Sequence, residues 1–402
     1  MLEITNIRQG AILNHNHGVE DEHGLTIKIE GLSDLPSHVF VNGVPAVRDG
    51  RRFFADVTLK EKVSTIAASA TTAFGEFSQS IRVVWDKKSF RRCNSYIDDH
   101  SFFWTDLIKE RPKRAFDHFY LAGLKKIHDK YGWKVTLNCF GRNDHFGGEI
   151  KDVPDIWRNE FIDNSDWLKM SVHSFAEFPD RPYIDATYED FTSEYDMIRD
   201  EIVRFAGEST FIAPVVLHWG NISPAVAQAL IERGCKAYSS MFRAHYMGGP
   251  SLADRLKGAQ AGNIAKCQAG AESMSRSRSA AQLGFGFDEH FNAMEENSYL
   301  ANHRAYYNPY LGVVFYWGYC CCNLVPIEQI PPRFAEAFKA AEKSGNELFS
   351  GASHEQYTFP YYHNYIPDHM ARIECAAKCL VEGGCTPVFY SEGFMGNMSW
   401  GK

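Results

Sequence analysis

The chain has 402 residues, of which 23% are charged and 45% hydrophobic, and its formal net charge is -8. This composition is typical of a soluble globular protein. The negative charge argues against a nucleic-acid binder. The sequence contains no run of 18 apolar residues, so no membrane-spanning helix is predicted. The length allows two domains, or one barrel with an appendage.

The N-terminus and the cysteines bear on the compartment. Residues 1–5 lack the basic start and apolar core of a secretory signal, so we expect a cytoplasmic protein, or a secreted or periplasmic one whose leader has been removed. Ten cysteines in a chain of this length do not form a disulfide scaffold. The unbroken run Cys320–Cys322 suits a reducing compartment. The sequence does not indicate the oligomeric state.

Residues 1–87 are predicted to form a small all-β domain. The strand-like runs are residues 25–29, 39–44, 53–57 and 81–85. Asn42-Gly43 is a strong hairpin-turn signal. Several short strands in so few residues indicate an immunoglobulin-like β-sandwich. We expect it to act as a rigid spacer or as part of a cleft wall.

From residue 88 to residue 402, strands alternate with helices. The predicted strands are residues 93–97, 134–138, 168–172 and 214–217, and the predicted helices are residues 116–131, 195–205, 224–233, 333–344 and 368–383. This alternation indicates an α/β fold with parallel strands, whose active residues belong at the C-terminal strand ends. Residues 247–308 break the rhythm, so we expect an insertion on the catalytic face, a candidate lid.

Asp98 and Asp99 directly follow the first of these strands. Adjacent carboxylates repel each other, and a metal ion removes that cost because it binds one and leaves the other as a base. Taken alone, the pair is explained more simply as a solvated turn. The residues that follow favour the metal.

His173 opens the loop after the strand at 168–172, and Glu177 lies four residues further on. One helical turn would place both side chains on the same face. Together with Asp99 they would form a nitrogen and oxygen site for a divalent metal. Zinc is the first expectation, with manganese, cobalt, nickel and iron as alternatives.

A strand ending in Asp-Asp, followed by a His-Ser-x-x-ligand motif, resembles the NodB-type polysaccharide deacetylases, which are metal-dependent carbohydrate esterases on a distorted (β/α) barrel. The resemblance implies that Asp98 is the general base and that Asp99 and His173 bind the metal. The family usually has a second histidine where this chain has Glu177. Glu177 would then be an acidic ligand, or the site would take a ligand from elsewhere.

The stretch from Pro214 to the helix at 224–233 is similar to the family's third motif. Ser223 and Pro224 are the predicted N-cap and first residue of that helix. The family's Arg-Pro-Pro-Tyr-Gly run is replaced by one with His218 and Trp219 and without arginine, which leaves open what orients the base. His218 would be a third nitrogen ligand or would bind substrate, and Trp219 is a substrate-binding candidate.

The run 347–356 resembles the last family motif, a strand that ends in a catalytic histidine. The resemblance implies that His354 protonates the leaving amine, which suits an imidazole because its pKa lies near neutrality. Glu355 would orient His354 or bind substrate. Further substrate-binding candidates are Tyr357, in an aromatic-rich run, and Arg142 and His145, which follow the strand at 134–138.

These motifs predict a metal-dependent hydrolase that removes an N-acetyl or other acyl group from a poly- or oligosaccharide. Asp98 would take a proton from the attacking water, and His354 would give one to the leaving nitrogen. Two alternatives stay open. One is a polysaccharide lyase or another carbohydrate-active enzyme on the same fold. The other is a non-catalytic sugar-binding protein, in which Glu177 marks a lost metal site.

Overall fold

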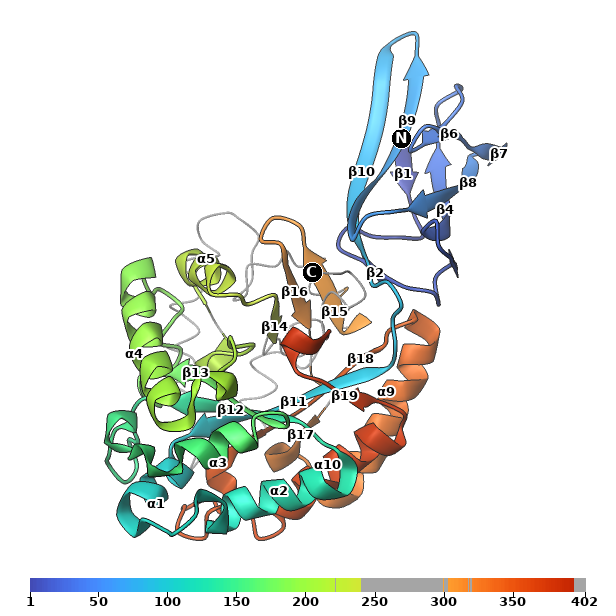
Figure 1. Ribbon diagram of the computed structural model, residues 1–402. Coiled ribbons are helices and arrows are strands. Elements are labelled where there is room, and N and C mark those ends of the chain that lie inside the picture. Colours follow the sequence, from blue (N-terminus) through green and yellow to red (C-terminus); the bar gives the residue numbers. More distant parts are fainter. Residues whose placement is uncertain (221, 240–298, 300–302, 317, 319, 394–402) are drawn as a thin grey trace, which may run out of the picture.

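A computed structural model describes residues 1–220, 222–239, 299, 303–316, 318 and 320–393 (Figure 1). An all-β N-terminal part projects from one corner of a larger α/β part (Figure 1). The expected insertion at 247–308 lies almost wholly outside the described residues. Its last four residues form a strand.

The N-terminal part consists of two five-stranded sheets, ordered β1-β4-β8-β7 with β3 on β4, and β2-β10-β9-β5-β6. The strands are β1 (Leu2–Ile4), β2 (Ile12–Leu13), β3 (Val19–Glu20), β4 (Leu25–Ser33), β5 (Phe40–Val41), β6 (Val44–Pro45), β7 (Val47–Asp49), β8 (Arg52–Leu59), β9 (Val63–Thr72) and β10 (Gly75–Trp85). Leu25, Ile27 and Ile29 point into a shared apolar core, because alternate side chains of a strand face the same side. The all-β prediction is confirmed for this part of the chain.

The larger part contains a six-stranded sheet ordered β13-β12-β11-β18-β17, with β19 also on β11. Its strands are β11 (Arg92–His100), β12 (Val135–Phe140), β13 (Leu168–Ser174), β17 (Cys320–Cys321), β18 (Leu348–His354) and β19 (Thr386–Pro387). Every pair is parallel, so the C-terminal ends lie at one edge. All residues of β11 and β12 are buried, as expected for strands covered on both faces.

A second sheet contains β14 (Ala237–Ser239), β16 (Val313–Tyr316) and β15 (Ala305–Asn308). Residues 211–217 run between β13 and β14: the Ile212 N–H donates to the Met170 carbonyl at 3.0 Å, and the Ser239 N–H donates to the Val215 carbonyl at 2.5 Å. The strand predicted at 214–217 is therefore an irregular segment without a ladder of its own. Within the described ranges the sheets form no closed barrel, and the fold is mixed α/β.

The helices are α1 (Phe102–Glu110), α2 (Phe119–Tyr131), α3 (Arg158–Asp163), α4 (Tyr188–Ala206), α5 (Pro224–Glu232), α9 (Ile330–Ser344) and α10 (His369–Glu382). In Figure 1, α2, α9 and α10 lie along one side of the six-stranded sheet. Ser223 caps α5 by accepting the Val226 N–H at 3.2 Å, as its sequence predicts. The five predicted helices are present, and α4 begins earlier than expected because Thr187 caps it.

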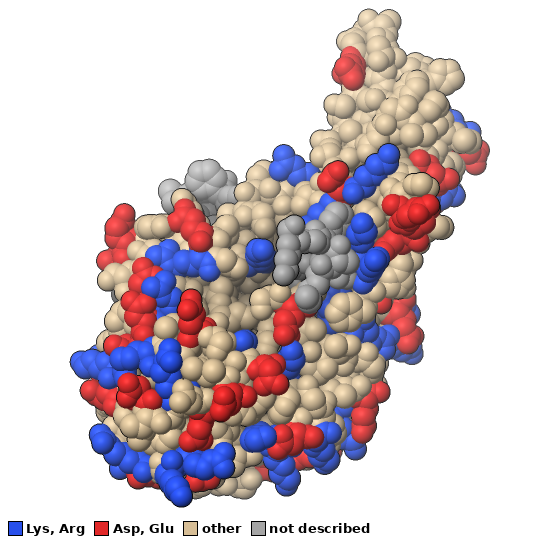
Figure 2. Space-filling model, in the orientation of Figure 1, with Lys and Arg blue, Asp and Glu red and all other residues tan. Residues whose placement is uncertain are grey.

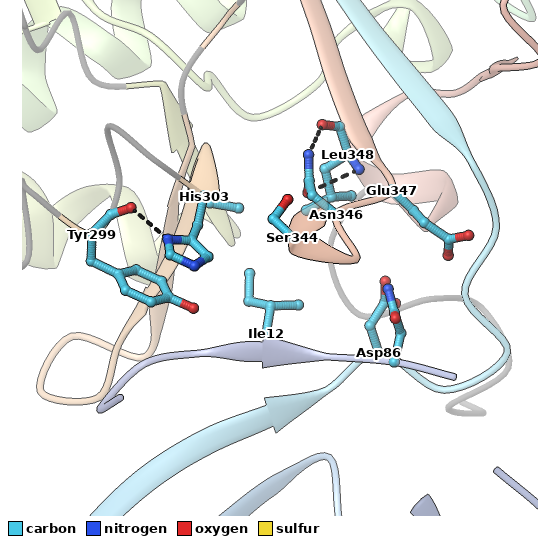
Figure 3. A pocket seen from close by; sticks show the side chains of 10 residues that line it. Ile12, Asp86, Tyr299, His303, Ser344, Asn346, Glu347 and Leu348 are labelled. Atoms are coloured by element: carbon cyan, nitrogen blue, oxygen red, sulfur yellow. Dashed lines mark hydrogen bonds between the residues drawn. The ribbon is translucent and has the colours of Figure 1, made fainter. Parts of the chain in front are cut away.

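The two parts meet through a polar junction. A buried ion pair of 2.6 Å joins Asp86, after β10, to Arg92 at the start of β11. A small cavity beside it is lined by Ile12, Tyr299, His303 and Glu347 among others (Figure 3). Glu347 directly precedes β18, so the cavity lies at the N-terminal edge of the six-stranded sheet, away from the strand ends that carry the candidate site.

Acidic and basic side chains are interspersed over the face shown in Figure 2, without a broad area of one sign. Among the residues with a described position, no helix is both long and apolar enough to cross a membrane.

Candidate metal centre

Asp98 and Asp99 lie within the last residues of β11 rather than after it. Successive side chains of a regular strand point to opposite faces, which would separate them. Asp99, however, has a left-handed backbone with φ of 65°, and the pairing of β11 with β12 shifts between Ile97 and His100. Aspartate tolerates this conformation better than most residues. The irregularity brings both carboxylates to the same edge of the sheet.

Asp99, His173 and His218 converge on one point. The Asp99 Oδ1 atom lies 3.1 Å from His173 Nε2 and 3.4 Å from His218 Nδ1, and the two nitrogens are 3.3 Å apart. The three residues are only 6%, 2% and 7% exposed. Tetrahedral ligands with zinc bonds of 2.0–2.1 Å are separated by about 3.3 Å. These three buried residues could therefore hold a divalent metal ion.

The outer atoms of the three ligands are fixed by hydrogen bonds. His218 Nε2 donates to the Glu177 carbonyl at 2.9 Å, and His173 Nδ1 donates to the Val216 carbonyl at 3.4 Å. Because a carbonyl only accepts, the lone pair of each ring lies on the nitrogen that faces the shared point. Gln356 Nε2 donates to the second Asp99 oxygen at 2.8 Å. This outer shell is typical of metal-binding histidines.

Asp99 and His173, two of the three candidate ligands, favour the charge state that binds a metal. Burial acts to raise the pKa of Asp99, but attraction by His354 and the close contacts with His173 and His218 hold it well below its usual range. Burial lowers the pKa of His173 to about 4, against the effect of Asp99. Burial also acts to lower the pKa of His218, but the bond to Asp99 raises it overall. A carboxylate and a neutral imidazole are the forms that bind metals.

Asp98 lies beside this triad. Its Oδ1 atom is 3.9 Å from His173 Nδ1 and accepts a hydrogen bond of 2.6 Å from Asn138 Nδ2. Burial raises the pKa of Asp98 well above its usual range, although the bond from Asn138 opposes this effect. Asn138, on the neighbouring strand β12, supplies an orienting contact that the sequence left open.

His354 ends β18 and is the cross-strand partner of Asp98 in the parallel ladder. Its Nδ1 atom donates to Asn323 Oδ1 at 2.9 Å and lies 3.6 Å from Cys321 Sγ. Burial lowers the pKa of His354, and Asp99 acts against this shift. The bond to Asn323 leaves Nε2 as the nitrogen that can exchange a proton.

Glu177 does not join the metal triad, contrary to our first choice of third ligand. His173 belongs to β13 and Glu177 to the following loop, so the expected helical turn does not form. The Glu177 carboxylate instead hydrogen-bonds the ring of His145, which raises the pKa of His145. His218 offers the third candidate ligand atom in its place.

Glu355 has a structural contact where we expected a catalytic one. It is fully buried, and its carboxylate accepts the backbone N–H groups of Ser101, Phe102 and Phe103 at 2.7, 2.8 and 2.8 Å. These are orphan donors at the N-terminus of α1, where a negative charge is stabilising. A carboxylate held in this way is not available to orient His354 or to bind substrate.

The predicted substrate-binding residues differ in their contacts. The Tyr357 ring is 6.3 Å from the ring of His354, and His145 is held by Glu177. Trp219 is partly buried within a 3-10 turn, and its backbone φ is 65°. Arg142 pairs with Asp144 at 2.7 Å, which turns it toward its own loop.

Four residues around the site were missed by the sequence analysis: Asn138, Gln356, Asn323 and Cys321. Asn138 and Gln356 each had a signal, because both lie at or just after the C-terminal end of a predicted strand. Asn323 and Cys321 lie in no recognised motif. Only the fold brings them beside His354.

No family model matches the chain, and no curated protein matches it. Solved structures with some likeness include the titin domains Z1Z2 in complex with telethonin, at 13% identity and a TM-score of 0.16, covering 24% of this chain and 56% of that one. A chimeric titin Z1Z2–Z1Z2 tandem functionalised with a fibronectin peptide has 8% identity and a TM-score of 0.16, covering 25% of this chain and 58% of that one. Scores this low carry no argument about fold or activity.

Proposed function

We propose that the chain is a metal-dependent hydrolase that removes an N-acetyl or other acyl group from a poly- or oligosaccharide. The observation that carries this proposal is the Asp99, His173 and His218 triad at tetrahedral separations, with Asp98 beside it and His354 on the adjacent strand. The resemblance of the sequence motifs to those of the NodB-type deacetylases supports the same activity. His218 would provide the nitrogen ligand that the family's second histidine usually provides.

The residues have complementary roles in the proposed reaction. Asp99, His173 and His218 would hold the metal, which supplies a Lewis acid that polarises the acyl carbonyl. Asp98 accepts a proton from water as the water oxygen bonds to the acyl carbon, and its raised pKa makes it a stronger base.

His354 gives its Nε2 proton to the leaving nitrogen as the carbon–nitrogen bond breaks, which releases a carboxylic acid and an amine. Burial lowers the pKa of His354, so its protonated form is a stronger acid. Asn323 holds the opposite ring nitrogen and keeps Nε2 directed to the reaction.

The sugar-binding alternative depended on Glu177 marking a lost metal site. Because His218, and not Glu177, is the third member of the triad, Glu177 no longer supports the sugar-binding alternative. No specific observation in the described part of the chain favours a lyase.

The test combines metal analysis with acetate release from acetylated chito- and xylo-oligosaccharides. Asp98→Asn should retain the metal and lose turnover, because it removes a base and leaves the ligands in place. Asp99→Asn should lose metal and turnover together. Near-normal rates for Asp98→Asn, or a wild-type protein that takes up no divalent metal, would contradict the proposal.

A further inference from the structure

Three aromatic side chains lie open to solvent at the edge of the sheet that carries the candidate metal centre. Phe119, Phe146 and Tyr361 are 48%, 41% and 46% exposed, and we call them the aromatic strip. Phe146 follows β12, Tyr361 follows β18, and Phe119 begins α2. Because β12 and β18 are parallel to β11, their following loops lie at the edge that carries Asp98 and Asp99.

A chain of contacts links the aromatic strip to the metal triad. His218 bonds the Glu177 carbonyl at 2.9 Å, and the Glu177 side chain bonds His145. The His145 ring centroid lies 6.2 Å from that of Phe146, which lies 5.0 Å from that of Tyr361. The Phe359 ring joins the third member, because its centroid lies 5.5 Å from that of Tyr361 and 5.1 Å from that of Phe119. The strip is therefore linked to the proposed active site by a series of side-chain contacts.

The Tyr361 ring is held in place although nearly half of it is exposed. Its hydroxyl donates to Asp106 Oδ1 at 2.8 Å, and the other Asp106 oxygen lies 3.2 Å from His118 Nε2. The ring also lies parallel to that of buried Phe102, at 5.8 Å and 6°. An ordered ring loses little conformational entropy when a ligand stacks on it.

Polar groups border these rings. The Lys109 ammonium lies 5.8 Å from the Phe146 ring centroid, and the His145–Glu177 pair lies on the side toward the triad. Aromatic faces with a few adjacent hydrogen-bonding groups suit sugar rings, which present apolar C–H faces and equatorial hydroxyls.

We infer that the aromatic strip binds sugar units of the substrate chain next to the unit whose acyl group is removed. This inference rests on the proposed function for the identity of the substrate as a carbohydrate. A substrate that occupies both the strip and the metal centre is an oligosaccharide or polysaccharide of several sugar units, and not a free monosaccharide.

The test measures binding rather than turnover. Calorimetric titrations with chitotetraose, xylotetraose, cellotetraose and N-acetylglucosamine would use the full chain in an Asp98→Asn background. Phe146→Ala and Tyr361→Ala should each weaken binding of the best tetrasaccharide by about three- to tenfold, from lost stacking. N-acetylglucosamine binding should not change. Phe74→Ala is the matched control, because Phe74 is 93% exposed on the N-terminal part.

Tyr361→Phe removes the hydroxyl but keeps the ring, so this variant should keep most of the affinity for the tetrasaccharide. If Tyr361→Ala does not fold, the Phe146→Ala variant tests the inference by itself. Unchanged tetrasaccharide binding in the folded alanine variants, or no binding of any tetrasaccharide, would overturn the inference. Weakened binding in a protein whose wild type releases no acetate would support the strip while the deacetylase proposal fails.

Discussion

The imidazole of His218 reaches Asp99 with one nitrogen and the main chain of Glu177 with the other. Glu177 thus supports the triad through its carbonyl, while its carboxylate serves His145. Side-chain and main-chain contributions of this one residue can be separated by substitution.

His218→Ala should weaken metal affinity by about a hundredfold or more, because it removes a direct ligand. Glu177→Gln keeps the carbonyl and should change the affinity only a few-fold. Competition with a chromophoric chelator measures both. A loss in Glu177→Gln as large as in His218→Ala would restore Glu177 as a ligand.

His354→Ala should slow hydrolysis of amide substrates far more than that of activated aryl esters. An amine leaves poorly without a proton, whereas a phenolate leaves without help. The comparison uses kcat/KM for an N-acetyl sugar and a nitrophenyl acetate. Equal losses on both substrates would leave His354 with a binding role only.

At the scale of elements, the N-terminus of α1 depends on a residue from the other end of the chain. Glu355 binds three N–H groups there, at the point where β11 passes into α1. This contact fixes the turn that follows Asp99 and His100.

Glu355→Ala should lower the free energy of unfolding by roughly 3 kcal/mol, since it leaves buried backbone donors without partners. Urea denaturation measures the loss, with Glu336→Ala on the exposed face of α9 as the control. A loss no greater than that of the control would show that water or another group replaces the carboxylate.

The elements were easier to predict than the side-chain partners. Apolar runs and caps predicted β11, β13 and α5 because these signals are local. Glu355 was misassigned because adjacency in sequence suggested a shared site, yet neighbours at a strand end point to opposite faces. Asn323 was not predicted, because it lies in a segment without a recognised motif and only tertiary packing brings it to His354.

At the scale of the whole molecule, two fully buried histidines tie stability to pH. His100 bonds the Tyr120 hydroxyl, and His369 bonds the hydroxyls of Ser353 and Thr358. Burial lowers the pKa of both histidines to about 3. Between pH 3 and the unfolded value near 6.5, the unfolded chain binds more protons, so stability rises with pH in this window.

Lowering the pH from 7 to 5 should therefore reduce the free energy of unfolding by about 2 kcal/mol for each of these histidines. His369→Gln should remove the contribution of one histidine to the pH dependence of the free energy of unfolding. The same substitution at exposed His23 should leave that dependence unchanged. Denaturant titrations at several pH values measure the slopes. Identical slopes in wild type and His369→Gln would exclude the linkage.

The left-handed backbone of Asp99 restricts which residues can replace it. Glutamate also binds metals, but it adopts this backbone conformation less readily than aspartate, whereas asparagine and glycine adopt it without added strain. Under the proposed function, a lineage that lost the metal would drift here toward asparagine or glycine before alanine or valine. Position 99 would then distinguish metal-binding descendants of this protein from those that no longer bind a metal.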